Sequence, residues 1–195
     1  IVGIVLLYTI NPKTAMFGAI SIFLYASVYT PLKTMTSLSV FVGAFPGAIP
    51  FMLGWVAATG EFGIEAGTLF LIQFFWQFPH FWAIAWVLDE DYKRAGFRLL
   101  PSTKQDKTSA LITLLSTIIL IPVSLMPTVY LMPSGQAFGG IIYTIIAVLA
   151  GLFFVWQAIQ LYNKRDVASA KKLMYTSFIY LPIMQLTLLF DFIAK

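Results

Sequence analysis

Residues 109–130 read SALITLLSTIILIPVSLMPTVY, a run without a charged side chain. A bilayer core about 30 Å thick is spanned by roughly 20 apolar residues in an α-helix, so this run is long enough to cross a membrane. Backbone polar groups in lipid must be paired within the spanning structure, which favours a helix over an open strand. The stretch therefore predicts a transmembrane helix.

The composition of the whole chain agrees with a membrane protein. Hydrophobic residues make up 59% of the 195 residues and charged residues only 10%, whereas soluble domains are about one quarter charged. The chain has no cysteine, which excludes disulfides and thiolate metal sites. The formal net charge is +4, and in a membrane protein such an excess belongs to cytoplasmic loops rather than to a nucleic-acid site.

Further apolar runs predict an all-α integral membrane protein, a multi-helix transmembrane bundle in one domain over 1–195. The first run is too short to span, and the chain begins with neither an initiator methionine nor a signal peptide. We therefore expect seven visible helices of a domain that lacks its N-terminal part. The candidate helices cover 1–10, 14–29, 38–59, 66–88, 109–130, 137–161 and 171–193.

Positive charge is distributed unevenly among the predicted loops. The loops at 29–37, 89–108 and 162–172 contain ten of the twelve Lys and Arg residues, and the remaining two are Lys13 and Lys195. Cytoplasmic loops carry such an excess. We expect these three loops, with the candidate site, to face the cytoplasm of a bacterial inner membrane.

The segment VGAFPGAIP at 42–50 combines Pro46 and Pro50 with small residues. Proline removes a helix hydrogen bond and kinks the helix, and small residues let helices approach closely in lipid. Two interpretations remain open, plain bundle packing and a kinked helix that opens a central cavity.

Three acids, Asp89, Glu90 and Asp91, stand where the predicted helix 66–88 ends. Acids at a helix C-terminus oppose the helix dipole, a cost that a ligand would offset. Mg²⁺ is commonly held by one or two carboxylates plus substrate phosphates. Lys93 and Arg94 follow directly and are suited to phosphate oxygens. The pattern indicates a magnesium–diphosphate site, with a solvated, self-neutralised loop as the alternative.

Tyr29 and Lys33 lie in the predicted loop on the same membrane side. Lys33 is a second cation that could reach the same anion. The alternative is a snorkelling lysine beside an interfacial tyrosine.

His80 is the one ionisable residue deep inside a predicted helix, where such groups normally face a cavity. Gln73, Gln77 and His80 are spaced four and three apart and should share one helix face, with Asp91 three turns beyond. Neutral imidazole is a good iron ligand, and a histidine hydrogen-bonded to a neighbouring helix is the alternative. The aromatic residues around it, including Trp76, fit a core, a lipid face or a porphyrin wall equally well.

Four stretches together resemble a known family. YTPLKTMT (29–36), GAFPGAIPFMLGW (43–55), WQFPHFWAIAW (76–86) and DEDYKRAGFRLLP (89–101) are similar to the protoheme IX farnesyltransferase (heme O synthase) family of UbiA-type intramembrane prenyltransferases. The resemblance implies a nine-helix bundle around a cavity open toward lipid. It also implies two aspartate-rich loops that bind prenyl diphosphate through Mg²⁺, of which this chain contains the second.

The resemblance implies roles for particular residues. Tyr29 and Lys33 match diphosphate ligands with catalytic roles, and Glu90 and Asp91 match the second acidic motif as metal ligands, with Asp91 also catalytic. Glu90 departs from the aspartate that the family commonly has there. Phe97-Arg98-Leu99 stands where the family usually has a small, proline-containing stretch, which puts the role of Arg98 in doubt.

The implied reaction is farnesyl transfer from farnesyl diphosphate to a vinyl group of heme B, giving heme O and diphosphate. Substrate-binding residues would be Lys93, Arg94, His80, Trp76 and Gln77. The expected partners are the lipid bilayer and a heme A synthase acting downstream, with no nucleic acid. Two alternatives stay open, a UbiA-type enzyme that prenylates an aromatic acid or quinone precursor, and a non-enzymatic membrane heme carrier.

Overall fold

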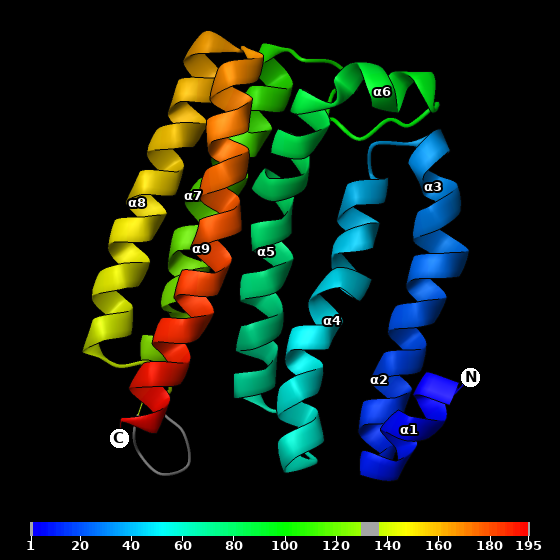
Figure 1. Cartoon of the computed structure of the whole chain (residues 1–195), viewed down its shortest axis with the longest axis vertical. Coiled ribbons are helices and arrows are strands. Elements are labelled where there is room, and N and C mark those ends of the chain that lie inside the picture. The colour runs from blue at the N-terminus through cyan, green and yellow to red at the C-terminus, as the bar shows by residue number, and fades with distance from the viewer. Residues whose placement is uncertain (1, 130–136, 195) are drawn as a thin grey trace.

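The computed structural model describes residues 2–129 and 137–194, and every regular element in them is helical (Figure 1). This confirms the predicted all-α class. The elements are α1 (Val2–Ile10), α2 (Pro12–Phe23), the π-helical segment η1 (Leu24–Tyr29), α3 (Thr30–Met35), α4 (Ser39–Thr59), α5 (Ile64–Val87), α6 (Asp89–Arg94), α7 (Lys107–Val129), α8 (Ile141–Lys164) and α9 (Val167–Ile193).

Five helical segments in the described ranges are long and apolar enough to cross a membrane: Pro12–Met35, α4, α7, α8 and α9. Their outward faces carry many exposed large apolar side chains, which suit lipid rather than water. α5 is equally long but is interrupted by polar and tryptophan side chains, and it lies in the middle of the bundle against α4, α7 and α9 (Figure 1). The predicted integral membrane class is confirmed.

Two predicted loops are shorter in the structure than the sequence predicts. The predicted helix 14–29 continues to Met35, because the π-helical turn before Pro31 accommodates a residue that has no N–H to donate. Tyr29 and Lys33 therefore lie on a helix rather than in a loop. The predicted loop 162–172 shrinks to two residues, because Asp166 accepts a hydrogen bond from the N–H of Ser169 and begins α9.

The core lies among α5, α7, α8 and α9. Hydroxyl groups form hydrogen bonds between its helices. Tyr143 on α8 donates to the carbonyl oxygen of Ser124 on α7 (2.7 Å), and the Ser124 hydroxyl lies 2.8 Å from that of Tyr180 on α9. Within a membrane, packing and interhelical hydrogen bonds rather than hydrophobic burial hold helices together. These contacts join α7, α8 and α9, and α5 packs against α7 and α9.

α4 keeps its helical course through Pro46 and Pro50. Pro50 has no N–H for the carbonyl oxygen of Pro46, one turn earlier. The hydroxyl of Ser21 on α2 donates to that oxygen instead, at 3.0 Å. The proline that weakens α4 thus leaves a carbonyl oxygen that ties this helix to α2.

Candidate functional site

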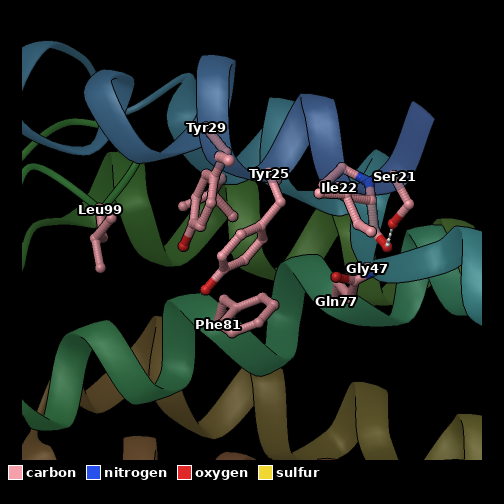
Figure 2. Close-up of a pocket in the computed structure, with 12 residues that line it drawn as sticks. Ser21, Ile22, Tyr25, Tyr29, Gly47, Gln77, Phe81 and Leu99 are labelled. Carbon is pink, nitrogen blue, oxygen red and sulfur yellow. Dashed lines mark hydrogen bonds between the residues drawn. The ribbon is translucent and has the colours of Figure 1, made fainter. Parts of the chain in front are cut away.

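A cavity of about 440 Å³ lies between the α2–η1 rod and the pair α4–α5 (Figure 2). α4 contributes Val40, Gly43, Pro46 and Gly47 to the lining as one continuous helix, so the choice between the two interpretations of segment 42–50 stays open. Most of the lining is apolar. The lining residues are Ser21, Ile22, Tyr25, Ala26, Tyr29, Val40, Gly43, Pro46, Gly47, Gln77, Phe81 and Leu99.

Tyr25 and Tyr29 project from η1 into this cavity (Figure 2), with ring centroids 5.4 Å apart. Gly43 on α4 makes room for Tyr29, since a Cβ added at Gly43 would lie 2.7 Å from two ring carbons of Tyr29. The π-helical turn and the glycine together place the Tyr29 ring in the wall.

Gln77 is the polar group of the opposite wall. Its amide Nε2 donates to the carbonyl oxygens of Ala44 (3.1 Å) and Gln73 (3.3 Å), which uses both of its N–H groups. Its Oε1 lies against Gly47, where a Cβ would clash with it, and has no hydrogen-bond partner in the described part of the chain. The side chain is therefore locked with an acceptor directed to the cavity.

The helix that carries Lys33 and the segment that follows α6 meet beside this cavity. The Lys33 ammonium lies 4.9 Å from the ring centroid of Tyr29 and 5.4 Å from that of Phe97. The N–H of Arg98 donates to the carbonyl oxygen of Lys33 (3.0 Å), and the segment continues into Leu99, which lines the cavity. Among the described residues, Lys33 has no ion-pair partner.

The acids do not end α5 as predicted. Leu88 separates the helices, and Asp89, Glu90 and Asp91 form the first turn of α6, where the helix dipole favours acids. The expected dipole penalty is therefore absent. Asp91 also stands on a different helix from His80, so the predicted continuous face does not exist.

The three carboxylates of α6 differ in their surroundings. Asp89 is buried and pairs with Lys93 at 2.6 Å. Glu90 and Asp91 are 88% and 70% exposed and lie 3.7 and 3.9 Å from Arg94. Within residues 2–129 and 137–194, no group of three or more His, Cys, Asp or Glu residues could hold a metal ion by itself. Two exposed carboxylates do fit Mg²⁺ when substrate phosphate completes its ligand set.

His80 and Trp76 face α9. His80 Nδ1 lies 2.8 Å from the Ser177 hydroxyl on α9, and Trp76 Nε1 donates to the Ser177 carbonyl oxygen at 3.0 Å. Gln77 faces α4 and Gln73 borders a separate cavity, so the predicted common face of the two glutamines and the histidine is wrong. Helix α5 thus presents Gln77 to α4 and His80 to α9.

A family model described as the UbiA prenyltransferase family matches residues 1–181. The chain belongs to the UbiA prenyltransferase family. The predicted resemblance to this family is confirmed, and the match includes the cavity and both charged motifs.

Several curated relatives of this UbiA chain share one name. A protein named protoheme IX farnesyltransferase from Flavobacterium johnsoniae is 59% identical over 98% of this chain and 63% of its own length. Proteins of that name from Cytophaga hutchinsonii and Solibacter usitatus are 46% and 39% identical, over 98% and 93% of this chain and 65% and 61% of theirs. The chain thus spans less than two thirds of the length of these relatives. No solved structure matches.

Several residues of this UbiA site were not predicted from the sequence. Tyr25 precedes Tyr29 by four residues, and this helical spacing was a usable signal. Phe81, Leu99 and Ser177 carried no such signal, because their positions depend on how separate helices and a loop pack together.

Proposed function

We propose that the protein transfers a farnesyl group from farnesyl diphosphate to a vinyl group of heme B, giving heme O and diphosphate. The observation that carries the proposal is the setting of Lys33, which has no ion-pair partner among the described residues and lies against Tyr29 in the wall of an apolar cavity. The segment that follows the acidic helix α6 is hydrogen-bonded to the Lys33 backbone. A polyanion with a long apolar tail fits that combination. The names of the relatives support the farnesyl donor and the heme acceptor.

Lys33 and Arg94 bind diphosphate oxygens in this proposal. Lys33 is held between two aromatic rings, so little side-chain freedom is lost when an anion binds. Arg94 lies only loosely beside its two acids and can turn to phosphate. Lys93 contributes less, because Asp89 already neutralises it at 2.6 Å.

Glu90 and Asp91 would hold Mg²⁺ together with the diphosphate. The ion would supply neutralisation of the diphosphate charge as the allylic C–O bond breaks with its electron pair leaving on oxygen. Tyr29 lines the cavity next to Lys33, and its hydroxyl would donate to the departing oxygen.

The cavity wall provides the rest of the reaction environment. Its apolar side chains exclude bulk water from the allylic cation. The vinyl π electrons form the new carbon–carbon bond, and one water oxygen then adds to the resulting cation and loses a proton. That gives the hydroxyethylfarnesyl side chain of heme O, which a heme A synthase would consume.

Orientation is also part of the proposal. The C-terminal end of α3, α6 and the connection of α8 to α9 lie at one end of the bundle, and the α4–α5 connection lies at the other (Figure 1). The first end carries most of the Lys and Arg residues. We place it in the cytoplasm of a bacterial inner membrane, because cytoplasmic surfaces carry such an excess and the relatives are bacterial.

The test uses the protein expressed from its complete gene in detergent with heme B, farnesyl diphosphate and Mg²⁺. Mass spectrometry should detect a hydroxyethylfarnesyl heme, and chelation of Mg²⁺ should abolish it. Asp91→Ala should lose the product, whereas Glu61→Ala, an exposed acid in the α4–α5 connection, should keep it. Prenylated 4-hydroxybenzoate in place of farnesylated heme would favour an aromatic prenyltransferase. Heme binding that is indifferent to Asp91→Ala, without product, would favour a carrier.

A further inference from the structure

His80 and Ser177 form a buried polar pair between α5 and α9. His80 is 7% exposed and Ser177 is fully buried, and their side chains lie 2.8 Å apart. Trp76 stacks on the imidazole, with ring centroids 4.3 Å apart and planes 17° apart, and its Nε1 holds the Ser177 backbone. The imidazole is thus fixed in position by two helices.

The hydrogen bonds of Ser177 determine which nitrogen of His80 carries the proton. The Ser177 hydroxyl lies 2.5 Å from the carbonyl oxygen of Met174 and has a single hydrogen. Two oxygens at that distance require the hydrogen between them, so Ser177 donates to Met174. The Ser177 oxygen can then only accept from His80, and Nδ1–H is the donor. His80 is therefore the Nδ1–H tautomer, and its lone pair is on Nε2.

Nε2 of His80 is not satisfied by the protein. It has no hydrogen-bond partner in the described residues, and it is not among the side-chain nitrogens that are sealed from the surface. The imidazole ring has two further aromatic neighbours, with the centroids of Phe178 and Phe81 5.0 and 5.2 Å from the imidazole centroid. An accessible lone pair in apolar surroundings needs an external partner.

His80 is linked to the cavity through Phe81. Phe81 contacts His80 and also lines the cavity, where its ring lies below Tyr25 (Figure 2). Phe178 is 49% exposed on the outer side. A flat apolar ligand seated against these two rings would place its periphery beside the cavity, where the allylic carbon of the donor would lie.

We infer that His80 Nε2 is an axial ligand to the iron of the heme acceptor, and that Ser177 is the positioning residue that fixes the required tautomer. The inference rests on the proposed function, because it makes heme the acceptor. A ligating histidine characteristically donates its other ring N–H to a nearby acceptor, and Ser177 fills that place. A purely structural histidine would need only the Nδ1 contact, and the accessible Nε2 would have no purpose.

The first test titrates the complete protein in detergent with ferric heme b and follows the Soret band. The unaltered protein should show the band of an imidazole-ligated heme. His80→Ala should lose that band and bind heme at least about tenfold more weakly. Added imidazole should restore the band in His80→Ala, which shows that the variant is folded. An unchanged band and affinity in His80→Ala would overturn the inference.

The second test concerns Ser177. Ser177→Ala should weaken heme binding about 10- to 100-fold and shift the iron–histidine stretching band of the ferrous complex, whereas Ser177→Thr keeps the hydroxyl and should resemble the unaltered protein. The matched control is Ser116→Ala, because Ser116 also donates to a carbonyl oxygen three residues earlier but lies on α7. If Ser177→Ala and Ser116→Ala gave the same heme affinity and the same stretching band, Ser177 would have no positioning role.

Product analysis distinguishes failure of iron ligation by His80 from failure of farnesyl transfer. Farnesylated heme formed equally by the unaltered protein and by His80→Ala, with unchanged heme spectra, would refute iron ligation and leave the proposed function standing. A His80-dependent heme spectrum without farnesylated product would refute the proposed transfer and leave the heme site standing.

Discussion

The N–H of Arg98 donates a hydrogen bond of 3.0 Å to the carbonyl oxygen of Lys33, and this bond joins two motifs that are far apart in the sequence. It places the Phe97 ring against the Lys33 ammonium, opposite the ring of Tyr29. The hydroxyl of Ser37 reinforces the contact by donating to the carbonyl oxygen of Pro101 at 3.0 Å. The segment after α6 thereby becomes part of the cavity end.

Removing the Lys33 charge should weaken the use of farnesyl diphosphate. A charge-assisted hydrogen bond contributes about 1.5–3 kcal/mol, so Lys33→Met should lower kcat/KM for farnesyl diphosphate by roughly 10- to 100-fold. The control is Lys172→Met, an exposed lysine on α9 at the same end of the bundle. Equal kcat/KM in the two variants would show that Lys33 is an interfacial lysine and no more.

Hydropathy was sufficient to predict the long helices, because apolar length is a property of the local sequence. It ended the predicted helix 14–29 too early, before Pro31. The chain passes that residue by a π-helical turn, and the same turn directs Tyr25 and Tyr29 into the cavity. A proline in an apolar run does not distinguish a helix end from a distorted helix.

The sequence allowed the residue types of the candidate site to be predicted, but not how these residues are arranged in space. The spacing of Asp89, Glu90 and Asp91 does not show that Leu88 starts a new helix, nor that Asp89 turns inward to Lys93. The partner of His80 depends on the register of α9 against α5, which has no local signal. Each miss concerns packing between elements that are separate in the sequence.

Gly43 should not tolerate a side chain, whereas Gly54 on the same helix should tolerate one. A Cβ at Gly43 would lie 2.7 Å from the Tyr29 ring, whereas nothing lies within 4 Å of one at Gly54. We expect Gly43→Ala to cost about 1–3 kcal/mol of stability by overpacking and to reduce farnesyl transfer by moving Tyr29. Gly54→Ala should gain roughly 0.5–1 kcal/mol with unchanged activity. Thermal unfolding in detergent and product formation measure both effects, and equal behaviour of the two variants would contradict the assigned contact.

Asp106 should make stability depend on pH. Its carboxylate accepts from the N–H of Ser109 (2.8 Å) and from the hydroxyl of Ser102 (2.7 Å), and these bonds, the first above all, hold the pKa of Asp106 below its usual range. Because the pKa is lower in the folded state, the stabilisation is complete above the unfolded pKa of about 3.9. It is lost as pH falls through the lower folded pKa.

The substitution Asp106→Ala isolates this contribution. At pH 7 it should lower stability by about 1 kcal/mol through loss of the cap on α7, and the difference from the unaltered protein should disappear as pH falls below about 4. Asp106→Asn keeps an acceptor without titrating, so its stability relative to Asp106→Ala should not vary with pH. Thermal midpoints between pH 7 and pH 3 test this, and a constant gap between the unaltered protein and Asp106→Ala would refute it.

Gln77 and Gln73 stand one turn apart on α5 and should respond differently to the same change. Gln77→Leu removes the hydrogen bond to the Ala44 carbonyl oxygen and the oxygen that faces the cavity. It should cost about 0.5–1.5 kcal/mol of stability and also lower kcat/KM for farnesyl transfer. Gln73 Oε1 is buried without a partner, so Gln73→Leu removes an unpaired polar atom and should be neutral or stabilising, with activity retained.

Unfolding midpoints and product rates for the Gln77→Leu and Gln73→Leu variants test this difference. If Gln73→Leu impaired transfer as much as Gln77→Leu, activity would depend on the general polarity of α5 rather than on the acceptor held in the cavity wall.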